Sequence, residues 1–503
     1  MEYLVLITSS LFFLIFIRYL LDLYGRTKLP PGPTGLPFLG SLLQIGPKPH
    51  RSLAKLAKEY GPLFTIQLGS ITNIVVSSSE MAREVLQTHD AEFSGRSIPD
   101  AVVGGQQNYD VSVAWISAQD QWRTIRRVLN IYFTNTKKVE MLEVLRLKVV
   151  TQMVDHIKEI SRRGQAVDIG KLAFTTALNQ MSNTCFSEDV AGFDSDQDDN
   201  GFYKGVKTIM KVVGKINCAD YFPWLKTFDP QGIRKEAWGA YGWLDQVCEK
   251  FINQRLRHRE SKLPPYGDLL DSFLDFQQQN PDDFNIMHIK ALLTDLFIAG
   301  TDNISSTIGW AMSELVLHPD VMHKVREEIS ERIKGKERLE EAETLELHYL
   351  QSVLKETMRL HLTVPLLLPH KSETDVKLNG YMIPKNTRVI INAWAIAHDT
   401  NFWENPDHFK PERFIGSEID YKGQHFSFLP FGSGRRMCSG IRLAERAMSL
   451  MLVSLAHFDW KLPNNMLPEE LDMDDTFGVT AQRATPLLLI PTLKADNIVL
   501  LWS

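Results

Sequence analysis

The pattern of apolar and polar positions predicts a mainly helical chain with short strands. Apolar residues recur every three to four positions through most of the sequence, whereas short alternating runs at 63–68 and 73–77 predict two strands. Residues 285–317 keep the helical spacing for more than thirty positions, until His318-Pro319 ends it. A helix of that length predicts an element that runs through a large core.

The N-terminal segment is a different kind of pattern, because residues 3–17 are almost wholly apolar. Together with the tyrosines and leucines that follow, it approaches the ~20 residues that a spanning helix needs. A cleaved signal peptide is the alternative, but no basic residue precedes the apolar run and no small-x-small cleavage site follows it. The basic residues Arg18, Arg26 and Lys28 place the remainder of the chain on the cytosolic side.

Prolines separate this segment from the body of the chain. Residues 29–40 begin Leu-Pro-Pro-Gly-Pro, and prolines fix φ and cannot continue a helix, so a stiff linker is expected. We therefore predict a membrane anchor with a basic flank at 1–28, a proline-rich hinge at 29–40 and one catalytic domain at 41–503.

Composition narrows the classes of function. The net charge of −6 across 503 residues gives no reason to expect nucleic-acid binding, and 44% apolar residues supply ample material for a core. None of the four cysteines forms a C-x-x-C pair, which argues against a structural zinc site or a redox dithiol. Their scarcity suits a domain that faces the cytosol.

One of these cysteines, Cys438, lies in a loop rich in glycine and arginine directly before a predicted helix at Ile441. Glycines let the backbone approach a flat cofactor, while loop amides and the helix N-terminus stabilise negative charge on sulfur. Arg436 can pair with a carboxylate of haem. An isolated cysteine in such a turn is more often simply buried, so the remainder of the chain has to decide between the two interpretations.

The spacing Phe431-x-x-Gly434-x-Arg436-x-Cys438-x-Gly440 resembles the haem-binding signature of the cytochrome P450 family. The resemblance implies that these five residues contact haem b, with Cys438 as the axial ligand of its iron. It also implies the family fold, which is mainly α with small β-sheets, here with a single-pass N-terminal anchor.

Further motifs follow in the family's order. The resemblance implies that Trp122 and Arg126, four apart on a helix face, meet haem propionates, and that His370 is a further propionate partner. It implies that the later arginine at 413 joins the Glu356-x-x-Arg359 pair in a buried structural triad.

The long helix contains Ala299-Gly300-Thr301-Asp302-Asn303, which resembles the oxygen-activation segment of the family. Small Ala299 and Gly300 would let the cofactor approach the backbone, and Thr301, Asp302 and Asn303 are the predicted catalytic residues. The family usually carries threonine where Asn303 stands. We therefore hypothesise that protonation uses the Asn303 amide, an ordered water or a substrate hydroxyl.

The resemblance implies a microsomal monooxygenase of the endoplasmic reticulum membrane that uses O2 and receives electrons from NADPH through NADPH–cytochrome P450 reductase. Arg435 and Arg442 are expected in the docking surface for that reductase.

The substrate class is predicted from finer similarity. Residues 166–170, 220–223, 228–232 and 477–479 look like the plant group that includes geraniol hydroxylases and ferruginol synthases. We expect a small hydrophobic terpenoid, with an abietane-type diterpenoid favoured, in a pocket that includes Val364, Leu366, Leu367, Phe477 and Val479. The alternatives are an alkaloid or a phenolic or aromatic amine substrate, a haem-thiolate isomerase or dehydratase that needs no external electrons, and a non-catalytic membrane haem protein.

Overall fold

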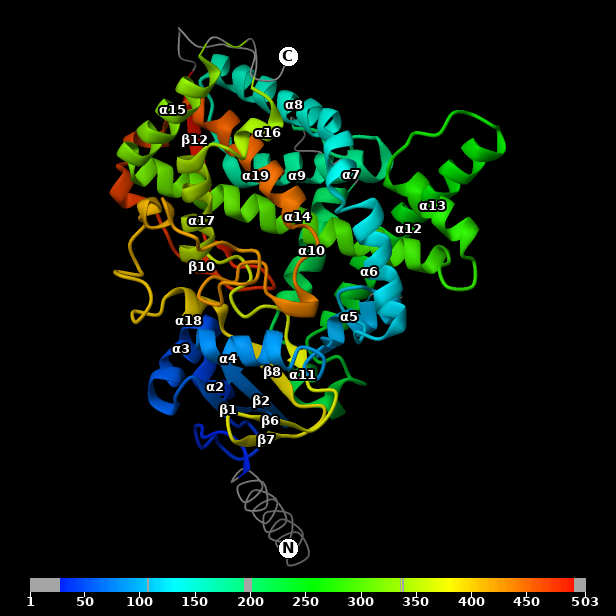
Figure 1. Ribbon diagram of the computed structural model, residues 1–503, viewed down its shortest axis with the longest axis vertical. Helices are drawn as coiled ribbons and strands as arrows, with labels where there is room; N and C mark the ends of the chain where they lie inside the picture. Colours follow the sequence, from blue (N-terminus) through cyan, green and yellow to red (C-terminus); the bar gives the residue numbers. More distant parts are fainter. Residues whose placement is uncertain (1–27, 106–107, 194–200, 335, 337–338, 493–503) are drawn as a thin grey trace, which may run out of the picture.

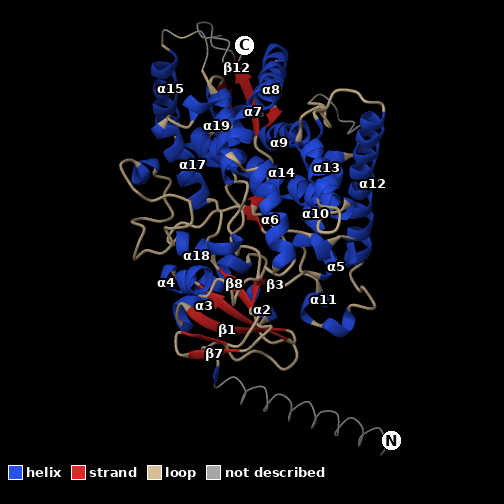
Figure 2. Cartoon of the chain, turned by 45° about the vertical axis from the view of Figure 1, so that its right-hand side comes forward, coloured by secondary structure: helices blue, strands red, loops and turns tan. Residues whose placement is uncertain are grey.

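The structure, a computed structural model, describes residues 28–105, 108–193, 201–334, 336 and 339–492. A large helical part carries a smaller part with most of the strands at the end where the described chain begins (Figures 1 and 2). The predicted anchor lies almost wholly outside the described residues. Within them, none of the helices combines the length and the apolar character that crossing a bilayer requires.

The middle of the described chain is helical, and most of the strands lie toward its two ends. The α-helices are α2 (Leu42–Ile45), α3 (Pro49–Tyr60), α4 (Ser79–Arg83), α5 (Asp100–Gly105), α6 (Asp120–Tyr132), α7 (Thr136–Met141), α8 (Glu143–Arg163), α9 (Ile169–Phe186), α10 (Phe202–Gly214), α11 (Cys218–Tyr221), α12 (Ile233–Glu260), α13 (Leu269–Gln279), α14 (Ile286–Leu317), α15 (Pro319–Ile333), α16 (Glu341–Thr344), α17 (His348–Leu360), α18 (Ala393–Ala397) and α19 (Ile441–Ala456).

The strands are β1 (Leu63–Leu68), β2 (Ile71–Val76), β3 (Gly95–Arg96), β4 (Val167–Asp168), β5 (His370–Lys371), β6 (Val376–Leu378), β7 (Tyr381–Ile383), β8 (Arg388–Ile391), β9 (Asp459–Lys461), β10 (Asp475–Thr476), β11 (Gln482–Arg483) and β12 (Leu488–Thr492). The largest sheet has the order β1-β2-β8-β5-β3, and β2 runs parallel to β8 with Val75 opposite Ile390. The mainly helical fold with small sheets is the one predicted.

The long helix α14 forms the centre of the helical part, where α9, α17 and α19 pack against it (Figure 1). It begins where the Asn285 side chain accepts hydrogen bonds from the N–H groups of Met287 and His288. It ends at Leu317, because Pro319 cannot continue the helix. These bounds differ from the predicted 285–317 by a single residue.

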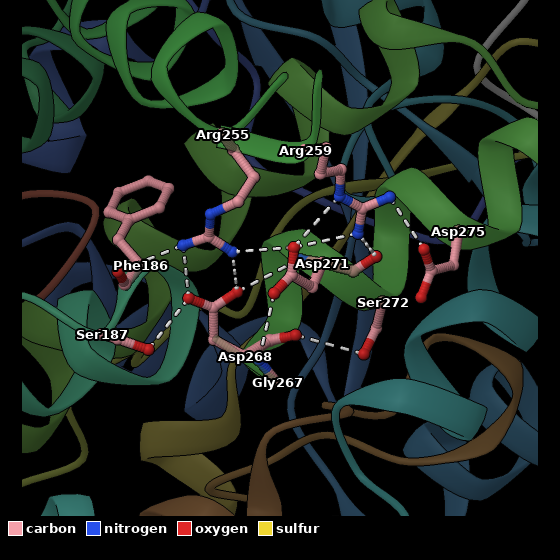
Figure 3. A network of polar contacts seen from close by, with 9 residues as sticks. All are labelled: Phe186, Ser187, Arg255, Arg259, Gly267, Asp268, Asp271, Ser272 and Asp275. Carbon is pink, nitrogen blue, oxygen red and sulfur yellow. Dashed lines mark hydrogen bonds and ion pairs between the residues drawn. The ribbon is translucent and has the colours of Figure 1, made fainter. Parts of the chain in front are cut away.

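A buried ionic cluster joins α12 to α13 (Figure 3). Asp268, at the N-cap of α13, receives two hydrogen bonds from the Arg255 guanidinium of α12, at 2.6 and 2.7 Å. Asp271 contacts both Arg255 and Arg259. Since the Asp268 side chain is wholly buried and that of Arg255 nearly so, each needs the other's charge. The cluster fixes α13 against α12, and α12 in turn packs against α10.

Candidate active site

A cavity of about 340 Å³ lies between α14 and the Cys438 loop. The helix α10 forms part of its roof through Ile209, Met210 and Val213. Other apolar wall residues are Leu86, Ala114, Phe133, Met181, Leu296, Ile298, Ile304, Leu362, Val364, Leu367, Leu368 and Val479. Such a space suits a hydrophobic ligand.

The Cys438 loop reaches this cavity through a backbone conformation that depends on glycine. Gly434 has φ of +68°, and a Cβ at that position would lie 1.7 Å from the carbonyl oxygen of Leu86. Either feature alone favours glycine. Next along the chain, the Cys438 N–H donates to the Phe431 carbonyl at 3.0 Å, which turns the loop back before α19 begins.

Cys438 is an exposed residue that lines the cavity. The protein packed around it desolvates the sulfur and raises the pKa of its thiol, and the Gly440 N–H, which donates to Sγ at 3.3 Å, and the positive charge of Arg126 oppose that rise. Both groups stabilise the thiolate, which is the form that binds a metal.

Three guanidinium groups, from Arg96, Arg126 and Arg436, gather around the same loop. Arg436 donates to backbone carbonyl groups of residues 94, 113 and 116, and Arg126 donates to the carbonyl of Met437 at 2.6 Å. Arg96 donates to the carbonyl of Leu368, but its buried Nε has no partner. In the part of the chain that the structure describes, none of the three forms an ion pair with a carboxylate.

The electrostatics of this cluster favour an anion. Burial and the neighbouring Arg436 lower the pKa of Arg96 to about 9, and burial and Arg126 lower the pKa of Arg436 to about 10. His370 also lines the cavity, with its Nδ1 2.8 Å from the Phe93 carbonyl, and burial holds the pKa of its imidazole well below the usual value. Buried cations are costly without counter-charges, so a ligand with carboxylates would stabilise this site.

The residues present therefore fit a haem. Cys438 would ligate its iron, and the carboxylates would lie toward Arg96, Arg436 and His370. Trp122 and Arg126 belong to the same region, since the Trp122 indole N–H donates to the Val113 carbonyl, an acceptor that Arg436 also uses. Phe431 and Gly440 line the cavity beside the cysteine.

On the opposite wall, Ala299, Gly300 and Asn303 of α14 line the cavity. The Nδ2 of Asn303 donates to the Ala299 carbonyl at 3.1 Å, which fixes the orientation of the amide, and its buried Oδ1 has no hydrogen-bond partner. Thr301 is buried elsewhere, with its hydroxyl donating to the carbonyl of Phe297. Of the predicted catalytic residues, the structure brings Asn303 alone to this wall.

Asp302 lies beside the cavity with its carboxylate held by groups from two other elements. Lys207 of α10 contacts Oδ1 at 3.1 Å, while Gln482 donates to Oδ2 at 2.6 Å and the Thr480 hydroxyl also donates to Oδ2. The Asp302 side chain is wholly buried. This arrangement connects the roof helix to the loop before β11 through one acid.

Glu356, Arg359 and Arg413 lie together below the cavity. Arg359 contacts both carboxylate oxygens of Glu356 at 2.8 and 2.9 Å, and Arg413 contacts Oε1 at 2.9 Å. Arg359 also donates to the Ala397 carbonyl at the end of α18. The triad thus ties α17 to the segments that precede the cysteine loop.

Three of the five predicted pocket residues, Val364, Leu367 and Val479, line the cavity. The other two do not: Leu366 packs against the largest sheet, and Phe477 stacks on His50. Arg96, Lys207, Thr480 and Gln482 are site residues that sequence reasoning missed. Arg96 had no local signal in the sequence, because its place beside the cavity depends on the pairing of β3 with β5, the strand that contains His370.

The comparisons with known proteins agree with this geometry. The model of the family "Cytochrome P450" matches residues 30–488. The chain is 43% identical to a geraniol 8-hydroxylase of Catharanthus roseus over 98% of its length and the whole of that relative. It is 41% identical to a geranylhydroquinone 3''-hydroxylase of Arnebia euchroma, over 92% of the chain and 94% of the relative.

Solved structures give the same answer. A zebra fish cytochrome P450 whose structure was determined with progesterone aligns with a TM-score of 0.74 and 26% identity, over 88% of this chain and 99% of that one. The agreement of motif, site and fold shows that the chain belongs to the cytochrome P450 family of haem-containing monooxygenases.

Proposed function

We propose that this monooxygenase hydroxylates a small hydrophobic terpenoid of plant specialised metabolism, with O2 and electrons from NADPH. The observation that carries the proposal is the apolar cavity between α14 and the open sulfur of Cys438. Relatives whose names specify geraniol and geranylhydroquinone as substrates support a terpenoid. Within that class, the abietane-type diterpenoid expected from the sequence is the finer proposal.

The chain's own residues have distinct tasks in this proposal. A haem bound through Cys438 supplies the oxygen-activating chemistry. The apolar walls orient the substrate by excluding water from all but a few polar positions. One such position is Asn303, which presents an amide beside Ala299 and Gly300. The carboxylate of Asp302, the residue before Asn303, is held by Lys207, Thr480 and Gln482. For a proton to pass from Asp302 into the cavity, one of these contacts must first rearrange.

We further propose that the protein acts at the endoplasmic reticulum membrane. Support comes from an exposed apolar patch, which consists of Leu36, Phe38, Leu43, Trp224 and Phe228. The patch has two parts, residues 36–43 and residues 224–228. The turn after β1 connects them, because its backbone N–H groups donate to the Leu39 carbonyl next to the first part and to the Tyr221 carbonyl near the second. Such patches mark contacts with membranes or partners.

NADPH–cytochrome P450 reductase is the proposed electron donor. Arg435 lies in the cysteine loop three residues before Cys438, and Arg442 lies in the first turn of α19. Arg435 is partly exposed in an ion pair with Asp90, and Arg442 is exposed and donates to the Thr136 hydroxyl. Both guanidiniums could therefore meet acidic groups of a partner.

Microsomes that contain the full chain and the reductase test the proposal. We expect NADPH consumption that tracks product from geraniol or from an abietane in a panel that also holds alkaloid and phenolic amine substrates. Product without NADPH would favour the isomerase or dehydratase alternative, and product from the amines alone would contradict the terpenoid assignment. Cys438→Ala is the control, and it should lose the thiolate Soret shift of the reduced, CO-bound protein.

A further inference from the structure

A second cavity of about 340 Å³ lies beside the first, between α3 and the C-terminal ends of α14 and α17. Its walls differ in kind from those of the active-site cavity. Trp310 and Trp394 provide aromatic surface, and several histidines and carboxylates provide polar surface, among them His50 and Asp475. Nothing in the proposed chemistry uses these groups.

The two cavities share one lining residue among those that the structure describes. Leu362 lines both of them and is only 3% exposed. Next to it, the Ala481 N–H donates to the Thr363 carbonyl at 2.7 Å, so the neighbouring part of the partition is hydrogen-bonded backbone. Opening the partition at Leu362 therefore needs a rotation of one apolar side chain, whereas opening it at Ala481 breaks a backbone hydrogen bond.

The second cavity holds two buried groups that lack hydrogen-bond partners. His50 is 2% exposed, and its Nδ1 has no hydrogen-bond partner. The Oδ2 of Asp475 is also buried without a hydrogen-bond partner. Asp475 Oδ1 accepts from Arg51 at 2.6 Å, but Oδ2 lies 3.6 Å from His50 Nε2, beyond a good hydrogen bond.

The two atoms without partners, His50 Nδ1 and Asp475 Oδ2, are both hydrogen-bond acceptors. Burial lowers the pKa of His50 to about 4 although Asp475 opposes that shift, so the imidazole is neutral near pH 7. The neighbouring carboxylate favours the proton on Nε2, which leaves Nδ1 as an acceptor. A molecule that carries a hydroxyl or N–H donor would satisfy these groups.

We propose that the second cavity is a transit site through which the hydroxylated product leaves the active site past Leu362. The proposal rests on the proposed hydroxylation of a hydrophobic substrate, because that reaction adds a hydroxyl donor, which the two acceptors of the second cavity can bind. The new hydroxyl also makes the product a poorer match for the apolar cavity. Arg51, with a side chain 45% exposed, and the exposed Asp407 form the outer rim, where the product would reach solvent.

Dissociation of a haem ligand tests the route without a substrate. The probe is 4-phenylimidazole, a small apolar molecule with an N–H donor, whose release from the ferric full-length protein is followed by stopped-flow at the Soret band. Leu317→Trp would fill the second cavity, because Leu317 lines that cavity and is absent from the lining of the first. We expect the dissociation rate to fall about tenfold, which corresponds to ~1.4 kcal/mol on the barrier.

Two further variants separate transit from a general effect of added bulk. Leu362→Phe should slow release as Leu317→Trp does, whereas Leu256→Trp, at an exposed position that lines neither cavity, should not. An unchanged rate in Leu317→Trp, or an equal fall in Leu256→Trp, would overturn the proposal.

The polar groups have their own test. His50→Leu should slow release of 4-phenylimidazole more than release of 1-phenylimidazole, which lacks the N–H donor, and equal effects would overturn the role assigned to His50. With geraniol as substrate, Leu317→Trp should lower kcat while the rate of a single turnover stays the same. Absence of geraniol turnover in the unaltered protein would count against the proposed function, while the ligand-release rates would still decide the route.

Discussion

Asn303→Thr places the family's usual residue on the wall of the active-site cavity. The Asn303 Oδ1 is buried without a partner, and such a group costs ~1–3 kcal/mol. A threonine hydroxyl could keep the bond to the Ala299 carbonyl, just as Thr301 and Thr307 donate to carbonyls four residues before them at 2.8 and 2.9 Å. Asn and Thr have nearly equal helix propensity, so we expect the free energy of unfolding to rise by about 1–2 kcal/mol.

Guanidinium unfolding of the detergent-solubilised holoprotein, followed by far-ultraviolet circular dichroism, measures this change. Asn303→Ala is the control, because it removes the orphan oxygen and also the bond to Ala299. The lost bond costs this variant ~1 kcal/mol and the higher helix propensity of alanine offsets about half of that, so its gain should be smaller than that of Asn303→Thr by about 0.5 kcal/mol. An unchanged or lower stability of Asn303→Thr would refute the reasoning, since it would mean that an ordered water already satisfies Oδ1.

The same variant tests the catalytic part of the hypothesis. If the amide takes part in proton delivery, Asn303→Thr should change the ratio of product formed to NADPH consumed, measured together in one reconstituted reaction with the reductase. A ratio and a product profile equal to those of the unaltered protein would remove Asn303 from the catalytic residues, whatever its effect on stability.

Three further outcomes follow from the buried and half-buried charges. Glu356→Gln should lower the free energy of unfolding by ~3–5 kcal/mol, because it leaves two guanidiniums without their carboxylate. Its control is Glu412→Gln, which alters a half-exposed pair with a lysine and should cost at most ~1 kcal/mol in the same denaturation assay. Asp268→Asn should cost about as much as Glu356→Gln, ~3–5 kcal/mol, since it discharges the buried partner of a guanidinium, and a loss below ~1 kcal/mol would contradict that account. The hydrogen bond with Glu314 raises the pKa of His318 in the folded protein. His318→Gln should therefore lower the free energy of unfolding by its full amount below pH 6.5, and this loss should vanish as the pH rises through the folded-state pKa of His318. An equal loss at pH 6 and pH 9 would show that no proton is involved.

Local signals in the sequence were strong where one segment contains both the chemistry and its geometry. The spacing from Phe431 to Gly440 identified the cysteine loop, and the structure adds why Gly434 is needed, since the Leu86 carbonyl occupies the space of a Cβ. The helical spacing and the His318-Pro319 pair that ends it made the long helix predictable almost to the residue, and the structure adds the cap at Asn285.

Contacts between distant segments were beyond the same reasoning. Helical spacing places Ala299, Asp302 and Asn303 on neighbouring positions of one face. The residues around Asp302 in the sequence do not indicate that its side chain turns toward Lys207. The orientation of Asp302 depends on α10, which lies almost a hundred residues before it in the chain. It depends also on Thr480 and Gln482, which lie far after it. Phe477 is a similar case, because its ring packs on His50 and not on the cavity that its neighbour Val479 lines.

The guanidinium cluster of Arg96, Arg126 and Arg436 has a consequence for how much of this protein a cell can maintain. The like charges oppose burial until carboxylates join them, so the bound haem contributes to folding as well as to chemistry. A ligand that binds only the native state stabilises it in proportion to the logarithm of its free concentration. The steady-state amount of the protein should therefore follow the haem supply, and degradation should remove the surplus chains first when haem is scarce.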